Sequence, residues 1–386
     1  MHRPVCLAFL LPFVLYLIFL CPDVAWDDSG EFVTAARCLG VPHAPGSPAV
    51  VILGRLFTCL PLGSVAFRVN LLSALASSLA AWMLYILFVR FLSGDREGQG
   101  IALLLSLAWS VSPWVMRYAL AAEVYGLAWM CLLAAVLLAD EYQRRDCRGP
   151  CSLYLLWGLV AGIGVSTSAL LAPFALLLLV VPFLDGRGIW IPASRLFGGL
   201  VLGLLPLGLP LLRSSYPPPL FHVEAATLSG LVRYLMGGQF EQQILRSVGR
   251  TDLQDWLWAG AGLLVVGLLL SRTPQPKRVC WFALIGIFNL AFVFLHRHPG
   301  HFFVPWLSAV LLLAAHVWPA RVGVAIAMGC LAATGLWSCK TPLRTVDLPL
   351  RWIERSTLAM PPCSTAFLGE INAAFPLLYS AVVQKE

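Results

Sequence analysis

Long apolar runs alternate with short polar segments along most of the chain. A helix needs about 20 apolar residues to cross the hydrocarbon core of a bilayer. The runs of this chain predict about eleven such helices. They cover residues 4–22, 68–92, 100–116, 122–140, 152–168, 169–184, 195–213, 255–272, 279–296, 302–320 and 322–337. Runs of this length do not fit the ten-residue alternation of a membrane β-barrel, so the pattern predicts an all-α polytopic membrane protein.

Two of these runs allow a second interpretation. The run at 4–22 could be a cleaved signal peptide, because "PDVA" at 22–25 resembles a cleavage site. The run is longer than a usual signal-peptide core, which favours a retained helix. The division of 152–184 into two helices depends on "GIGVSTSALLAP" at 162–173, which is a weak break.

The composition supports lipid as the main solvent. Of the 386 residues, 59% are hydrophobic and 12% are charged, whereas soluble domains average roughly 25% charged residues. A soluble fold could not bury so much apolar surface. We therefore expect one transmembrane domain over residues 1–337 and a short tail over 338–386.

Basic residues predict how the chain is oriented. Lys and Arg concentrate in short cytoplasmic loops of membrane proteins. With the N-terminus in the cytoplasm, the cytoplasmic segments and helix ends hold a dense set of them, namely Arg3, Arg90, Arg96, Arg144, Arg145, Arg148, Arg187, Arg195, Arg272, Lys277, Arg278 and Arg321. The tail then lies on the non-cytoplasmic side. The net charge of +7 is thus largely a topology signal, and a nucleic-acid partner is not expected.

Polar features gather on the predicted non-cytoplasmic side. They are residues 27–43, 117–126, 214–254 and "HRHPGH" at 296–301. Ionisable residues near membrane segments are costly, and they often mark functional sites. Prolines at 42, 45, 48 and 61 interrupt the apolar run within residues 23–67. Residues 23–67 are therefore predicted to form short helices along the membrane interface instead of a span.

Several motifs resemble one membrane-protein family, in the same order along nearly the whole chain. They are "DSGEFVTAARCLGVPHAPGSP" at 28–48, "FRVNLLSAL" at 67–75, "AEVYGL" at 122–127, a divergent loop motif at 217–240, "FFVP" at 302–305 and "MPPCSTAFLGEINAAFPLLY" at 360–379. They are similar to a large group of bacterial membrane proteins that also includes the eukaryotic transmembrane protein O-mannosyltransferases, of GT-C glycosyltransferase type. The first motif is the most specific.

The chain also departs from that family pattern. Ala44 and Ser47 replace a proline and a tyrosine of the first motif, and Phe221 with His222 replaces an asparagine and a tryptophan. Polar positions that are often histidines are Ser166, Thr167 and Ser168 here. These differences leave the acceptor open.

The resemblance implies a GT-C-like fold and a glycosyltransferase without a cofactor. The enzyme would move a sugar, with mannose as one candidate, from a polyprenyl-phosphate donor to a protein or glycan acceptor. The reaction would take place in contact with membrane lipid at the non-cytoplasmic face, and a bacterial inner membrane is the expected location.

The chemistry of such a transfer requires a base and a cation. A carboxylate can accept the acceptor proton, and Asp28 is the preferred base, with Glu31 on the same face if the segment is helical. Asp27 could contact substrate or cap a helix. Arginine matches phosphate oxygens, and the candidate phosphate partners are Arg55, Arg68 and Arg117. Arg68 could equally anchor the start of a span.

Other polar residues have more than one possible role. His43 could polarise a hydroxyl as a catalytic residue or order the turn "HAPGSP". Glu123 could bind substrate or pair with Arg117. Tyr125 could bind substrate or serve as an interfacial aromatic residue, and Asn70 of the second motif is a further candidate for substrate binding.

The sequence also raises the question of a metal site and of two functions other than catalysis. His296, His298 and His301 lack an acidic neighbour and a regular spacing, so no metal site is expected there. A transporter or flippase of lipid-linked sugars would place charges near mid-span and show paired broken helices, whereas these charges cluster at one end. An inactive scaffold is favoured only if Asp28 and Glu31 face open solvent.

Overall fold

The computed structural model describes most of the first 235 residues of the chain. The described ranges are 2–25, 28–44, 46–92, 95–145, 149–168, 190–221 and 227–235, together with Tyr379 and Val383. Within these ranges every regular element is a helix, and the one β-bridge joins Val41 to Phe221. The predicted all-α class is therefore confirmed for the described residues.

The helices vary in length from one short turn to a full membrane span. Their bounds are α1 His2–Phe19, α2 Ser29–Cys38, α3 Pro48–Thr58, α4 Val65–Phe91, α5 Arg96–Ser110, α6 Pro113–Ala119, α7 Tyr125–Arg144, α8 Cys151–Thr167, α10 Trp190–Leu204, the 3-10 turn η2 Leu205–Gly208, α11 Leu209–Ser214 and α12 Leu228–Leu235.

Three helical segments are long and apolar enough to cross a membrane. They are Val65–Arg90, Tyr125–Arg144 and Ala193–Ser214, and three shorter apolar helices are Pro4–Phe19, Pro48–Thr58 and Cys151–Thr167. The chain is an integral membrane protein. The predicted spans 169–184, 255–272, 279–296, 302–320 and 322–337 lie outside the described residues, as does the tail apart from Tyr379 and Val383.

Prolines shift two of the predicted span boundaries. The run predicted at 100–116 ends at Ser110, and Pro113 begins the separate helix α6. The run predicted at 195–213 is divided by Pro206 and Pro210 into α10, η2 and α11. Proline lacks the backbone N–H that continues a helix but fits a first turn, so helices restart at these positions.

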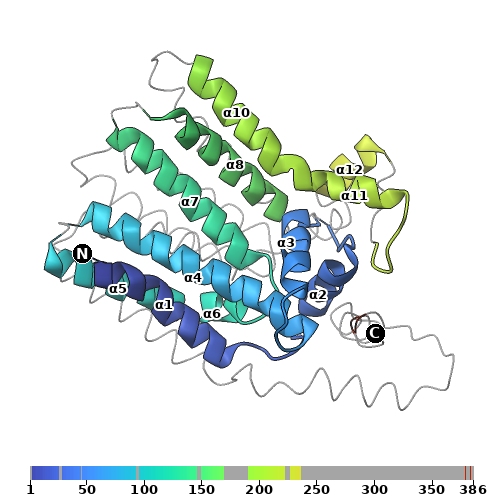
Figure 1. The fold of residues 1–386 in the computed structure, drawn as a ribbon, viewed down its shortest axis with the longest axis horizontal. Helices are drawn as coiled ribbons and strands as arrows, with labels where there is room; N and C mark the ends of the chain where they lie inside the picture. The colour runs from blue at the N-terminus through green and yellow to red at the C-terminus, as the bar shows by residue number, and fades with distance from the viewer. Residues whose placement is uncertain are drawn as a thin grey trace, which may run out of the picture.

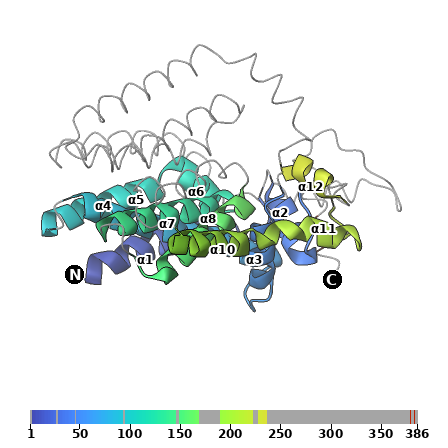
Figure 2. The same ribbon diagram turned by 90° about the horizontal axis from the view of Figure 1, so that it is seen from above.

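The long helices lie side by side, so their ends gather in two groups (Figure 1). At one end Arg90 of α4 pairs with Asp140 of α7, with 2.8 Å between Nη1 and Oδ2. At the other end the Asn70 amide of α4 donates to the carbonyl of Cys21, over 2.9 Å. Both views show α2, α3, α11 and α12 at this second end, opposite the N-terminus (Figure 2). We call it the loop end.

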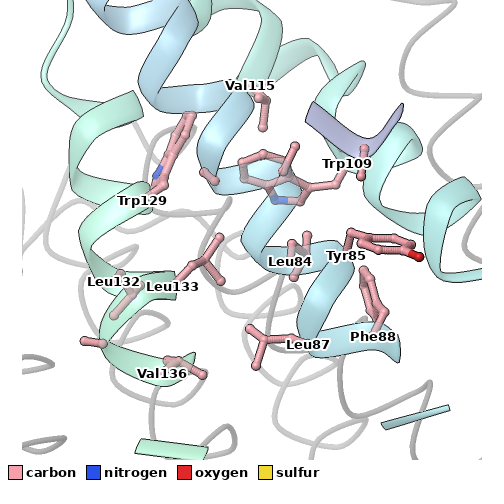
Figure 3. Packing of buried hydrophobic residues seen from close by; sticks show 14 of the residues in the cluster. Leu84, Tyr85, Leu87, Phe88, Trp109, Val115, Trp129, Leu132, Leu133 and Val136 are labelled. Carbon is pink, nitrogen blue, oxygen red and sulfur yellow. The ribbon is translucent and has the colours of Figure 1, made fainter. Parts of the chain in front are cut away.

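Aromatic and glycine contacts fix the helix packing. Trp109 and Trp129 meet edge to face with ring centroids 5.9 Å apart, within a core of leucine, valine and aromatic side chains from α4, α5 and α7 (Figure 3). Between α8 and α10 the backbones touch directly. A Cβ on Gly162 would lie 2.5 Å from the Leu200 carbonyl oxygen, so only glycine permits this approach.

Two short helices, α2 and α3, lie between α1 and α4. Pro48 opens α3, and α2 is followed by its C-cap residue Leu39, whose φ of 49° is left-handed. The backbone N–H of Gly40 then donates to the carbonyl of Ala35 over 2.8 Å, which satisfies a carbonyl at the helix end. The two helices position the site. Their placement along a membrane interface stays a prediction.

Candidate functional site

The candidate site is built on the first turn of α2. Asp28 occupies the N-cap position of this helix, although its side chain makes no capping hydrogen bond. Asp27, the cap expected as one alternative, lies outside the described residues. Every residue from Ser29 to Ala36 is buried, so packing on both sides fixes the helix. Asp28 and Glu31 are then one turn apart and reach the same neighbour, His43.

Glu31 and His43 make two contacts with each other. The backbone N–H of His43 donates to Oε1 of Glu31 over 2.7 Å. The ring atom Nδ1 of His43 makes a short hydrogen bond with Oε2 of Glu31. The side chain of Glu31 is 0% exposed, and a buried carboxylate is costly unless it is paired and hydrogen-bonded. His43 supplies both requirements.

Asp28 approaches the other nitrogen of the imidazole. Its Oδ2 is 3.8 Å from Nε2 of His43, and the side chains of His43 and Asp28 are 20% and 32% exposed. The three residues thus form a compact group of a fully buried carboxylate, an imidazole and a carboxylate that solvent or substrate can reach. We call this set the Asp28–Glu31–His43 cluster.

The two carboxylates change the pKa of His43. Burial alone would lower this pKa, but the hydrogen bond from Glu31 and the negative charges of Glu31 and Asp28 outweigh burial and raise it above the usual value. The imidazolium form therefore persists to higher pH than in a free histidine. In the neutral form, the bond to Glu31 favours the tautomer with a proton on Nδ1.

Two of the predicted phosphate partners are bound to backbone carbonyls. The guanidinium of Arg55 donates from Nη1 to the carbonyl of Arg37 over 2.5 Å, at the C-terminal end of α2. Arg68 donates from Nε, Nη1 and Nη2 to the carbonyls of Leu62, Thr58 and Gly63 over 2.6, 2.7 and 3.0 Å. Arg68 therefore ties the α3–α4 connection to the start of α4. This agrees with the alternative role of Arg68 as an anchor at the start of a span.

The remaining predicted residues also lie at the loop end. The Asn70 amide donates to the carbonyls of Cys21 and Asp23 over 2.9 and 3.0 Å, and so fixes the chain that leads to Asp28. Glu123 is 8% exposed, and its backbone N–H bonds the Ser73 hydroxyl at 3.2 Å.

An aromatic pair lies beside the third predicted arginine. The ring of Tyr125 lies 4.6 Å from that of Tyr118. The exposed Arg117 stands over the same Tyr118 ring, with 5.8 Å from guanidinium carbon to centroid. Asp28, Glu31 and His43 are thus brought together by direct contacts. His296, His298 and His301 lie outside the described residues.

The same cluster contains atoms that could surround a metal ion. One ligand atom from each of Asp28, Glu31 and His43 lies within 4.8 Å of the others. Two carboxylates with one imidazole suit several divalent cations. A cation would have to displace the contact between Nδ1 and Glu31, which already satisfies the buried carboxylate. The contacts also fit proton and hydrogen-bond chemistry.

Sequence comparison assigns a family to the first part of the chain. Residues 28–184 match a family model described as the protein O-mannosyl-transferase TMEM260 N-terminal domain. This part of the chain is related to the protein O-mannosyl-transferases. The match begins at Asp28, so it contains the whole cluster and the helices that hold it. The resemblance expected from the motifs is thereby confirmed.

Two curated relatives carry the same family name. The chain is 44% identical over 101 residues to protein O-mannosyl-transferase TMEM260 of Mus musculus, which covers 26% of this chain and 14% of that protein. It is 27% identical over 143 residues to protein O-mannosyl-transferase tmem260 of Dictyostelium discoideum, covering 36% of this chain and 17% of that protein. The aligned part is therefore a small share of each relative.

Two solved structures share a weaker likeness. They are crystal structures of ArnT from Cupriavidus metallidurans, one bound to undecaprenyl phosphate and one in the apo state. The TM-scores are 0.44 and 0.47, with 10% and 14% identity. The matches cover 99% and 97% of this chain and 88% and 84% of those chains.

One residue at the site was missed by sequence reasoning. Tyr234 of α12 donates its hydroxyl to the carbonyl of Pro42 over 2.5 Å, across 192 residues of sequence. The resemblance at 217–240 marked the segment and drew attention to Phe221 and His222, but not to Tyr234. A single tyrosine in an apolar segment gives no local sign of such a contact.

Proposed function

We propose that the chain is a GT-C-like membrane glycosyltransferase that uses a polyprenyl-phosphate sugar and a protein or glycan acceptor. The family match over residues 28–184 and the names of the two relatives support a glycosyl transfer. The helical membrane fold supports a donor whose chain lies in lipid. Mannose is the first sugar to test, because both relatives are named as mannosyl-transferases.

The observation that carries this proposal is that the carboxylate of Asp28 is accessible while it contacts the rest of the cluster. Asp28 is 32% exposed and lies 3.8 Å from His43. In the proposed step the acceptor hydroxyl oxygen attacks the anomeric carbon of the sugar, and its proton passes to the carboxylate of Asp28. The bond between that carbon and the phosphate oxygen breaks, and polyprenyl phosphate leaves with the electron pair. Glu31 and His43 hold the geometry from the buried side.

Arg117 is the preferred partner of the leaving phosphate. Arg55 and Arg68 donate to backbone carbonyls, which gives each a structural role. Arg117 is exposed at the loop end, on α6. A guanidinium matches the oxygens of a phosphate and stabilises the charge that develops on it. Glu123, Tyr125, Asn70 and Asp27 remain proposed substrate-binding residues.

The proposed orientation places the loop end outside the cytoplasm. Arg90, Arg144 and Arg145 lie at the opposite end of the helices, and positive residues favour the cytoplasmic side. The donor phosphate and the acceptor would then meet the cluster at the non-cytoplasmic surface. A bacterial inner membrane stays a prediction from the resemblance, and both named relatives are eukaryotic.

One assay tests the proposed function. Purified protein in lipid nanodiscs is incubated with a panel of polyprenyl-phosphate sugars and candidate acceptors, and sugar release and transfer are followed by mass spectrometry. An enzyme consumes at least one donor and releases polyprenyl phosphate. Translocation of an intact donor across proteoliposomes, without release, would instead identify the flippase alternative. No release and no translocation would refute both.

A further inference from the structure

The turn that carries His43 is covered by a later segment of the chain. Leu231 and Tyr234 of α12 pack against Val41 and Ala44. The backbone N–H of Val41 donates to the carbonyl of Leu220 over 2.9 Å. The later segment therefore holds Val41 and Ala44 through both backbone and side-chain contacts.

Tyr234 makes the most directional of these contacts. Its side chain is 5% exposed, and its hydroxyl donates to the carbonyl of Pro42 over 2.5 Å. The ring lies against Gly46, whose φ of +84° favours glycine, and a Cβ there would overlap the tyrosine hydroxyl. Burial, and then the nearby charge of Glu31, raise the pKa of Tyr234. The phenol therefore stays neutral and remains a hydrogen-bond donor.

We propose that Tyr234 is a positioning residue for the Asp28–Glu31–His43 cluster. Pro42 immediately precedes His43, so holding its carbonyl fixes where the His43 backbone begins. Both the backbone N–H and Nδ1 of His43 must meet Glu31 at once. A turn that moved by a fraction of an ångström could not keep both contacts. The geometric claim stands on these contacts, and the catalytic consequence rests on the proposed function.

Amide hydrogen exchange at His43 tests the geometric claim without any activity. Tyr234→Phe keeps the ring but removes the donor. It should raise the exchange rate of the His43 amide about tenfold, because a buried hydrogen bond contributes on the order of 1 kcal/mol and its loss leaves an unsatisfied acceptor. The control is Tyr216→Phe, which removes the same group from a side chain that is 79% exposed. That control should leave the rate unchanged.

Two further measurements distinguish a local effect on His43 from general destabilisation. Amides of α4 around Leu84 report general destabilisation, and their exchange should not change in Tyr234→Phe. Gly46→Ala approaches the contact from the other side by displacing the tyrosine hydroxyl, and it should raise exchange at His43 as well. The proposal is overturned if neither variant changes exchange at His43, or if α4 and His43 change equally.

The catalytic consequence is measured separately. Tyr234→Phe should lower kcat about tenfold with little change in KM, since orientation and not donor binding is affected. Combined with Glu31→Gln, the two losses should be less than additive, because both act through His43. Fully additive losses would contradict a shared path. If the wild-type protein transfers no sugar at all, the proposed function fails, while hydrogen exchange still decides the role of Tyr234.

Discussion

Replacing Asp28 by Asn tests its role as a proton acceptor, because the shape of the side chain is kept. The side chain keeps its size but can no longer take the acceptor proton. Asp28 makes no capping hydrogen bond with its own helix and is 32% exposed. The folded state should therefore lose little stability, and the protein should still reach the membrane.

The expected loss of turnover is large. General-base catalysis is typically worth about 10²–10⁴-fold, which corresponds to roughly 3–5 kcal/mol in the activation barrier. Donor binding should change little, because the phosphate is assigned to Arg117. Arg117→Ala should differ by weakening donor binding as well as turnover. The two variants thus separate the roles of base and phosphate partner.

The assay follows sugar transfer at equal protein level in membranes, with donor binding measured on the same preparations. Asp27→Asn is the control, because it is matched in size and sequence neighbourhood. Its effect should be mild, since a helix cap contributes roughly 1 kcal/mol. Near-normal transfer by Asp28→Asn would refute the assignment of the base. Loss of transfer in Asp27→Asn alone would assign the role of base to Asp27 and would leave the proposed enzyme class unchanged.

Three further outcomes are expected. The pKa of His43 is raised in the folded state, so its stabilising contribution is complete below the ordinary value of about 6.5 and is lost as pH rises through the folded value. The thermal midpoint of the wild-type protein should fall across that pH window. Glu31→Gln should make this fall smaller. Gly162→Leu should lower the thermal midpoint by forcing α8 away from α10, whereas Gly198→Leu, with open space around its Cβ position, should not. A C-terminal reporter that is active only in the cytoplasm should stay silent, and an active one would show that the predicted span count or orientation is wrong.

Features set by local sequence were predictable, and those set by distant contacts were not. Within the described residues the apolar runs predicted the helices, and Pro42, Pro45, Pro48 and Pro61 predicted that residues 23–67 form no span. The spacing of Asp28 and Glu31 placed them one turn apart. The double contact between Glu31 and His43 spans a helix end and a turn, so spacing alone could not reveal it.

The arginines show the same limit for charged residues. In sequence, Arg68 and Arg117 are equivalent candidates for a phosphate. Their difference arises because the α3–α4 connection turns its carbonyls toward the guanidinium of Arg68. The path of a short connection depends on tertiary packing, which residue type does not encode locally. The resemblance to a family gave the order of the motifs along the chain. It did not give the contacts between them.

The bond between Tyr234 and Pro42 has a consequence for biosynthesis. The two residues are 192 positions apart, and translation adds about 5–20 residues per second. The turn that carries His43 would therefore wait on the order of 10–40 s before the residue that fixes it leaves the ribosome. During that interval the nascent protein would have inserted helices but an incompletely ordered cluster. Chains truncated before residue 234 should accordingly enter the membrane without acquiring a competent site.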